Sequence, residues 1–338
     1  MTSRLPERLR LFTGPTPIQG LPRLGARLGL DVSIKRDDLT GFAESGNKIR
    51  KLEFLAREAL DQGADTLITV GALQSNCARA TAAIAARLGL RCLLGLRGER
   101  PPVADGNLLL ARLFGAEPVF VPPEEVDQPD ALVARLSERV RREGGRPYVI
   151  PESGSNELGV LGYAAAVEEL LAQVAAGAPA PHVIVIAAWS GGSLAGLYLG
   201  KALFGLDAEI WGVPVAFEAD LIRDYVWATI RKAAARFGWD VHVDRAAIRL
   251  LDGYQGVGRA AVRPEELAVV AEAARESGVL LDPVYTAKAF HALCVEGRHH
   301  PSLHGRRVLF LHTGGGFGVF PYREALTRLL DGARPPSA

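Results

Sequence analysis

The most informative part of the chain is the stretch Ser45-Gly46-Asn47-Lys48-Ile49-Arg50-Lys51-Leu52-Glu53, where a turn leads into a segment of helical spacing. A lysine in the first turn of a helix lies beside free backbone amides and the positive end of the helix dipole, and both favour the neutral amine. A neutral amine is a nucleophile toward an aldehyde, so Lys48 is a candidate for a covalent link. A solvated first-turn lysine is the competing interpretation. The neighbouring cations Lys35, Arg50 and Lys51 are more typical of helix surfaces or ion pairs.

On both sides of this stretch, short apolar runs alternate with longer segments of helical period. The pattern predicts an α/β fold with twisted parallel sheets and helices on both faces. The expected strands are residues 32–35, 66–70, 92–96, 118–121, 183–187, 209–213 and 308–312. The expected helices include residues 51–62, 78–88, 108–114, 131–143, 158–175 and 264–277.

Two clusters of turn residues divide the chain, at residues 45–47 and 151–154. They enclose a βα segment of about 100 residues, which is enough for a small domain. We therefore expect a small inserted domain over residues 48–154 and a large domain over residues 1–47 and 155–338. Strand ends and helix N-termini converge between two α/β lobes, so a cofactor site is expected there.

Polar side chains follow the strand expected at 66–70, in the stretch Gly71-Ala72-Leu73-Gln74-Ser75-Asn76-Cys77. Hydroxyl, amide and free backbone N–H groups at a strand-to-helix turn can together bind one anionic group. A carboxylate or a phenolate oxygen would suit such a turn. The competing interpretation is a plain helix cap formed by Gln74, Ser75 and Asn76.

A glycine-rich turn follows the strand expected at 183–187, with the sequence Ser190-Gly191-Gly192-Ser193-Leu194-Ala195-Gly196. Glycines let the backbone approach a phosphate closely, and the next helix offers its N-terminal amides. No lysine follows the glycines, and the spacing lacks the dinucleotide fingerprint, so neither of those two nucleotide motifs is present. Close helix packing remains the alternative to a phosphate loop.

Two C-terminal stretches also place polar side chains at the ends of elements. They are Leu281-Asp282-Pro283-Val284-Tyr285-Thr286 and the strand end at His312 followed by Thr313-Gly314-Gly315-Gly316. Tyr285 and Thr313 are candidate site residues, although a core-packing tyrosine and a strand-end hydroxyl are the plainer interpretations. His312 is expected to be structural.

The composition argues against several classes of function. The 39 Lys and Arg against 38 Asp and Glu give a net charge of +1, which provides no electrostatic case for nucleic acid or an anionic membrane as partner. The 3 cysteines are an odd number without metal-ligand spacing, so neither disulfides nor a metal site is expected and a cytoplasmic setting fits. No apolar signal segment or membrane span is expected.

These motifs, in this order, resemble the D-cysteine desulfhydrase and 1-aminocyclopropane-1-carboxylate deaminase family of fold type II pyridoxal 5'-phosphate (PLP) enzymes. The likeness runs from about residue 11 to residue 320. It implies PLP as the cofactor, a two-lobed molecule that holds PLP between a large lobe and a smaller inserted lobe, and usually a homodimer.

The resemblance also implies roles for individual residues. Lys48 falls on the Schiff-base lysine, Asn76 on the asparagine near the cofactor's phenolic oxygen, and Ser75 on the serine near the substrate carboxylate. Tyr285 matches a substrate-side tyrosine, so Lys48, Ser75 and Tyr285 are the expected catalytic residues. The phosphate loop of the family matches Ser190, Gly191, Gly192 and Ser193.

Within this family, the deaminases carry a glutamate after the tyrosine, set against the pyridine nitrogen, and a leucine in the C-terminal glycine motif. Thr286 and Thr313 stand at these positions, which resembles the desulfhydrases, where the threonine before the glycines meets the ring nitrogen. Cys77 stands where histidine or glutamine is usual, and Arg259 where the family has a second tyrosine. An arginine suits a carboxylate or sulfonate. The expected substrate-binding residues are Ser75, Asn76, Cys77, Tyr254, Arg259 and Tyr285.

The resulting expectation is a PLP-dependent α,β-elimination on a small amino acid, with D-cysteine, converted to pyruvate, ammonia and sulfide, as the first candidate. Elimination from another β-substituted amino acid such as cysteate, ring-opening deamination and β-replacement stay open as alternatives. A PLP-binding or amino-acid-binding protein without catalytic activity is the alternative from another class.

Overall fold

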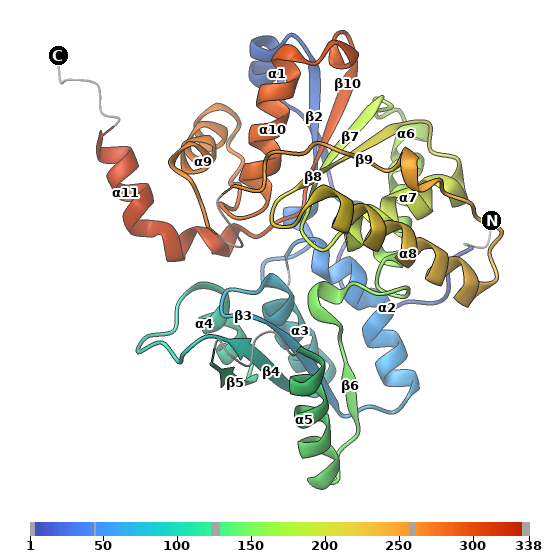
Figure 1. Ribbon diagram of the computed structural model, residues 1–338, viewed down its shortest axis with the longest axis vertical. Helices are drawn as coiled ribbons and strands as arrows, with labels where there is room; N and C mark the ends of the chain where they lie inside the picture. Colours follow the sequence, from blue (N-terminus) through green and yellow to red (C-terminus); the bar gives the residue numbers. More distant parts are fainter. Residues whose placement is uncertain (1–3, 44, 123–128, 257–260, 333–338) are drawn as a thin grey trace.

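The computed structural model describes residues 4–43, 45–122, 129–256 and 261–332, which form two separate sheets (Figure 1). The larger sheet has six strands in the order β1-β2-β10-β7-β8-β9. Their bounds are β1 Ile18–Gly20, β2 Asp31–Arg36, β7 Val183–Ala188, β8 Glu209–Pro214, β9 Arg249–Leu250 and β10 Arg307–His312. Neighbouring strands run parallel, as predicted, except that the short β1 is antiparallel to β2.

The smaller sheet has four parallel strands in the order β5-β4-β3-β6. Their bounds are β3 Thr66–Ala72, β4 Arg91–Arg97, β5 Glu117–Val121 and β6 Pro147–Val149. All strands of this sheet come from one continuous part of the chain, which supports a small inserted domain. The exact division at residues 48 and 154 stays a prediction.

Helices cover both faces of each sheet, which confirms the predicted fold class. Their bounds are α1 Pro22–Leu28, α2 Asn47–Asp61, α3 Asn76–Leu88, α4 Gly106–Leu113, α5 Pro129–Arg142, α6 Leu161–Ala175, α7 Gly192–Phe204, α8 Ala219–Phe237, α9 Pro264–Ser277, α10 Thr286–His299 and α11 Arg323–Gly332. Alternate residues of β7 enter different cores, since Ile184 packs with residues of α6 and α7 while Val185 packs with residues of α9 and α10. This alternation is what a strand buried on both faces requires.

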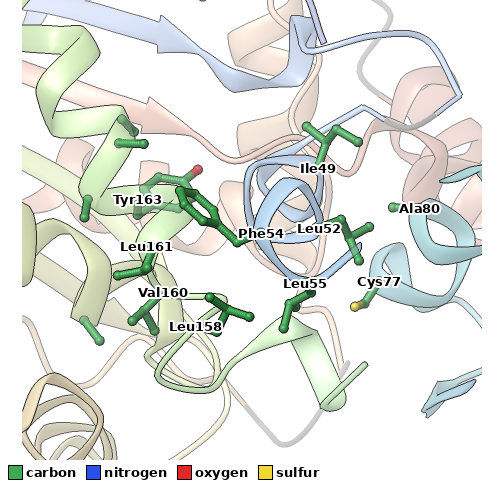
Figure 2. Packing of buried hydrophobic residues seen from close by; sticks show 14 of the residues in the cluster. Ile49, Leu52, Phe54, Leu55, Cys77, Ala80, Leu158, Val160, Leu161 and Tyr163 are labelled. Atoms are coloured by element: carbon green, nitrogen blue, oxygen red, sulfur yellow. The ribbon is translucent and has the colours of Figure 1, made fainter. Parts of the chain in front are cut away.

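Helix α2 joins the two sheets (Figure 1). Its apolar residues belong to one buried core that also contains residues of both sheets. Figure 2 shows Ile49, Leu52, Phe54 and Leu55 of α2 lying between Cys77 and Ala80 of α3 and the group Leu158, Val160, Leu161 and Tyr163. The helix that carries Lys48 is therefore held from two sides.

A buried ion-pair network anchors the same helix to the larger sheet. Arg50 of α2 donates to Asp37 at 2.8 Å and to Glu169 of α6 at 2.9 Å. Lys35 of β2 donates to the same Glu169 at 2.6 Å, and Tyr163 donates to Asp37 at 2.8 Å. Lys35 and Arg50 were expected on helix surfaces or in ion pairs; both form ion pairs, and the surface alternative is wrong because both side chains are buried. The network fixes the first turn of α2, where Lys48 lies, relative to β2.

Candidate active site

A cavity lies where the N-termini of α2, α3 and α7 meet the ends of β7 and β10. The empty space between its walls, counted out to its open mouth, is about 590 Å³. Its described lining residues are Asn47, Lys48, Lys51, Ser75, Asn76, Cys77, Ser153, Ala187, Ala188, Trp189, Ser190, Gly191, Gly192, Ser193, Leu194, Tyr285, Thr313 and Gly314. The Lys48 turn, the start of α3, the glycine-rich turn and the residues Tyr285 and Thr313 therefore meet in one place.

Lys48 is half-buried in the first turn of α2 and faces this cavity. The turn is fixed by its neighbours, since Asn47 donates its backbone N–H to the carbonyl of Thr313 at 2.9 Å and its side-chain amide to Ser193 Oγ at 3.0 Å. Gly46 has φ 102°, and a Cβ there would lie 2.8 Å from the Thr313 carbonyl oxygen. Burial lowers the pKa of the Lys48 amine, which makes it easier to hold neutral.

The glycine-rich turn between β7 and α7 has the backbone form of an anion site. Gly191 has φ 84°, a conformation that favours glycine, and α7 begins at Gly192. A Cβ at Gly192 would collide with Ser155 Oγ and lie 2.9 Å from Lys51 Nζ. Free N–H groups at the start of α7 thus open onto a polar space with a lysine, and such a space fits a phosphate.

Lys51 is the main site residue that the sequence interpretation missed. Its side chain is 1% exposed, and its amine donates to Ser155 Oγ at 2.9 Å and to the Ser153 carbonyl at 3.3 Å. Ser155 Oγ in turn lies 3.1 Å from Ser190 Oγ of the glycine-rich turn. Burial, and after it the charge of Lys48, holds the pKa of Lys51 well below its ordinary range. The interpretation of Lys51 as a helix-surface or ion-pair residue is wrong, and the three-residue spacing from Lys48 was the available signal.

The stretch before α3 contributes three side chains to the cavity. Ser75 caps the helix by accepting a hydrogen bond from the Ala78 backbone at 3.1 Å, so the cap interpretation is correct for Ser75, which still lines the cavity. The side chain of Gln74 binds the start of α4 instead. Asn76 accepts a hydrogen bond from the amide of Asn107 at 3.1 Å. Cys77 is buried, and burial raises the pKa of its thiol. The thiol is therefore held in the neutral form.

Tyr285 and Thr313 also line the cavity. The carboxylate of Asp282 accepts the backbone N–H of Tyr285 at 3.0 Å and the hydroxyl of Thr286 at 2.8 Å. Thr286 is fully buried in this capping interaction. Trp189 packs against the Tyr285 ring with the centroids 5.2 Å apart, and it is a cavity residue that the sequence interpretation did not include.

One predicted substrate residue, Tyr254, is not brought to this cavity. The hydroxyl of Tyr254 donates to Glu296 at 2.7 Å, and Tyr254 is absent from the described cavity wall. Arg259 lies outside the described residues. His312 is buried between the Leu280 carbonyl and the Gly314 backbone N–H, in agreement with a structural role.

The residues present fit PLP. A lysine with a lowered pKa can bond to its aldehyde, and a glycine-lined helix start with a second buried lysine can hold its phosphate. Fold and site together define a PLP-dependent enzyme built on two parallel sheets.

Comparison with known proteins leads to the same class. The chain matches the pyridoxal-phosphate dependent enzyme family over residues 9–314, and it belongs to that family. PLP is its cofactor.

Two proteins and one solved structure are similar to this chain over nearly its whole length. The chain is 42% identical over 320 residues to the D-cysteine desulfhydrase of Yersinia pestis (strain Pestoides F), with 93% of this chain and 96% of that protein covered. It is 41% identical over 321 residues to a Thermotoga maritima protein that carries the provisional name 1-aminocyclopropane-1-carboxylate deaminase, with 94% and 99% covered. A crystal structure described as an ACC deaminase homologue superimposes with a TM-score of 0.86 at 38% identity and covers 96% of each chain.

Proposed function

We propose that this enzyme catalyses α,β-elimination on a small amino acid, with D-cysteine as the first candidate substrate and pyruvate, ammonia and sulfide as products. The observation that carries the proposal is the single cavity that joins the Lys48 amine, the phosphate-type turn, the Ser75–Asn76 helix start and a threonine, Thr313, at the end of β10. The identity of 42% to a D-cysteine desulfhydrase supports the choice of substrate.

The cofactor would be held by residues from both ends of the cavity. Lys48 would bond to the aldehyde, and Asn76 would donate its amide N–H to the phenolic oxygen. The backbone N–H groups from Gly191 to Ser193, the hydroxyl of Ser190 and the amine of Lys51 would bind the phosphate. Thr313 would meet the pyridine nitrogen with its hydroxyl.

The reaction needs one base, one carboxylate site and a closed pocket. PLP, when bound, supplies the electron sink that acidifies the Cα–H bond of the amino acid. The released Lys48 amine takes the Cα proton, because its lowered pKa favours the neutral form. Ser75 at the start of α3 binds the substrate carboxylate. Tyr285 lies on the side of the cofactor where the substrate binds. The Cβ–S bond then breaks to release sulfide, and water enters to give pyruvate and ammonia.

Ring-opening deamination is the second candidate, and two similar proteins carry deaminase names. A carboxylate against the pyridine nitrogen would favour that chemistry, because it would keep the nitrogen protonated and draw charge away from Cα. Thr313 offers a hydroxyl, and the hydroxyl of Thr286 is bonded to Asp282 at 2.8 Å. These two residues favour elimination.

A substrate panel tests the proposal. Purified, PLP-loaded protein is incubated with D-cysteine, L-cysteine, 3-chloro-D-alanine, L-cysteate and 1-aminocyclopropane-1-carboxylate while keto acid and ammonia are followed. Pyruvate and sulfide from D-cysteine are expected. A keto acid from the cyclopropane substrate alone would establish the deaminase, a preference for cysteate would point to an anionic leaving group, and no product from any compound would favour a binding protein.

The assignment of Lys48 has its own test. Borohydride reduction followed by peptide mapping should label Lys48, and Lys48→Ala should lose the reducible link while still binding PLP weakly through the phosphate turn. Labelling of Lys51 or Lys35 instead would overturn the assignment.

We further propose a homodimer in the cytoplasm, acting on a small amino acid without nucleic acid. Phe42 is 79% exposed and packs on Phe317, whose segment contacts α4 with the exposed Leu109 and Leu113. Exposed apolar side chains on neighbouring segments are typical of an interface between subunits. No described helix is both long enough and apolar enough to span a membrane. Light scattering after gel filtration measures the oligomeric state.

A further inference from the structure

We propose that Asn107 is a positioning residue for the cofactor: it holds Asn76 so that the amide N–H of Asn76, and not its carbonyl oxygen, faces the ring oxygen of PLP. The inference rests on the proposed function, which places Asn76 at that oxygen. Asn107 lies in the first turn of α4, outside the cavity wall, and its side chain is 1% exposed.

The orientation of the Asn107 amide follows from a backbone group. Its Nδ2 lies 2.9 Å from the carbonyl oxygen of Gln74 and 3.1 Å from Oδ1 of Asn76. A backbone carbonyl can only accept, so the Asn107 atom that faces it must be the NH₂ group. The second proton of the same NH₂ group is then directed at Asn76, so the Asn76 atom that accepts this hydrogen bond must be its side-chain oxygen.

The orientation of Asn76 follows in turn. With its oxygen bound to Asn107, its own NH₂ group points the other way, toward the cavity and the turn after β10. A Cβ built on Gly315 in that turn would lie 3.2 Å from Asn76 Nδ2. Asn76 therefore offers a donor to the cavity, and a donor is what an oxyanion on the cofactor ring needs.

A second feature indicates that Asn107 is present for its donor rather than for stability. Its own side-chain oxygen is buried and has no hydrogen-bond partner among the residues that the structure describes. A buried acceptor without a partner is destabilising, so the side-chain oxygen itself adds nothing to stability. The NH₂ group is the part of the side chain that the site uses.

Gln74 provides a control, because it joins the same two segments without touching Asn76. Its side chain accepts from the Asn107 backbone N–H at 2.9 Å and donates to the Asp105 carbonyl at 3.0 Å. If Asn107 served only to attach α4 to the turn before α3, removing the Gln74 side-chain contacts would change the cofactor's absorption as much as removing the Asn107 amide does. Gln74→Met removes the former and leaves the contact between Asn107 and Asn76 intact.

The test is a pH titration of the visible absorption band of the Lys48-bound cofactor in the wild type, Asn107→Leu, Asn76→Ala, the double variant and Gln74→Met. An N–H donated to the ring oxyanion favours loss of the neighbouring imine proton, so its removal should raise the titration midpoint. We expect a rise of about one pH unit in Asn76→Ala, corresponding to a tenfold change in the protonation equilibrium. At least half of that rise is expected in Asn107→Leu, no further rise in the double variant and the wild-type midpoint in Gln74→Met.

A wild-type midpoint in Asn107→Leu, a rise that persists in the Asn76→Ala background, or an equal rise in Gln74→Met would each overturn the proposal. Circular dichroism of the free proteins checks folding, and Asn107→Asp, which replaces the donor by an acceptor, serves for the same comparison if the leucine variant does not fold. Failure of the proposed function would differ, since it would appear as absence of pyruvate from D-cysteine in the substrate panel, while a wrong assignment of Lys48 would leave the wild type without a reducible link and without this band.

Discussion

Replacing Lys51 by methionine separates phosphate binding from every other role of the cavity. Methionine keeps an unbranched apolar stem of similar length and removes the amine that donates to Ser155. A charge-assisted hydrogen bond contributes about 1.5 to 3 kcal/mol. Burial lowers the pKa of Lys51 well below its ordinary range, so protonating the amine on binding consumes part of that free energy. We therefore expect PLP to bind about 10- to 30-fold more weakly, near the lower end of the range.

The assay compares PLP with pyridoxal, which lacks the phosphate. Apo protein is titrated with each ligand, and the ratio of the two dissociation constants is measured for the wild type, Lys51→Met and Lys232→Met, a control at an exposed lysine of α8. The dissociation constant of pyridoxal divided by that of PLP should be lower in Lys51→Met than in the wild type, and unchanged in Lys232→Met. Pyridoxal has no phosphate that could bind the amine of Lys51. Binding of the phosphate raises the pKa of Lys51 from its lowered value, so the loss of PLP affinity with rising pH should be steeper in the wild type than in Lys51→Met. An unchanged ratio in Lys51→Met would refute the assignment.

Three further outcomes follow from the same structure. Gly192→Val should weaken PLP binding far more than Tyr285→Phe, because a side chain at Gly192 enters the space beside Lys51; equal affinities would remove the turn from the site. Thr313→Glu should slow pyruvate release and produce a long-wavelength absorption band during turnover, since a carboxylate keeps the ring nitrogen protonated, and an unaltered spectrum would argue that Thr313 lies elsewhere. Asp37→Asn should lower the free energy of unfolding in urea at pH 7 by about 3 kcal/mol, the lower end of the range for a broken buried ion pair, because Arg50 loses Asp37 and keeps Glu169. Although burial opposes the shift, Arg50 keeps the pKa of Asp37 below its ordinary value of 3.8, so the difference between wild type and variant should shrink as the pH falls below about 4. Equal unfolding free energies at pH 7 would contradict that role.

The strands were predictable because each is a short apolar run closed by turn residues. All seven expected strands are present, and the short β1, β6 and β9 were missed because two or three residues do not establish a period. Helix α7 was not among the helices predicted from the helical spacing of apolar residues. Its residues Leu194 to Leu199 are all buried, so it has no polar face that alternates with an apolar one. Helix α6 begins at Leu161, because Asn156 accepts the N–H groups of Leu158 and Gly159 in a separate turn.

The site was predictable where a motif concentrates several polar residues, as at Ser75 and Asn76 or at Ser190 to Ser193. Single residues that reach the cavity from elsewhere were not. Trp189 stands at the end of an apolar strand, where a large aromatic residue indicates core packing. Tyr254 lies in a polar loop, yet its hydroxyl is bonded to Glu296. Neither the pairing of a loop tyrosine nor the direction of a strand-end side chain is encoded in local spacing.

Lys48 and Lys51 form one device, because three residues along a helix place both amines on the same face, with about 4.5 Å of axial rise between their Cα atoms. The first amine must be neutral to react, and the second must be charged to bind a phosphate. Burial lowers the pKa of both, and the charge of Lys48 lowers that of Lys51 further. In the proposed site, a phosphate dianion beside Ser155 would reverse this for Lys51 alone, because it would lie next to that amine. Cofactor binding would thus leave Lys51 charged, as a phosphate ligand, and Lys48 neutral, as a nucleophile. A single turn of α2, held by the Arg50 network, separates the two residues.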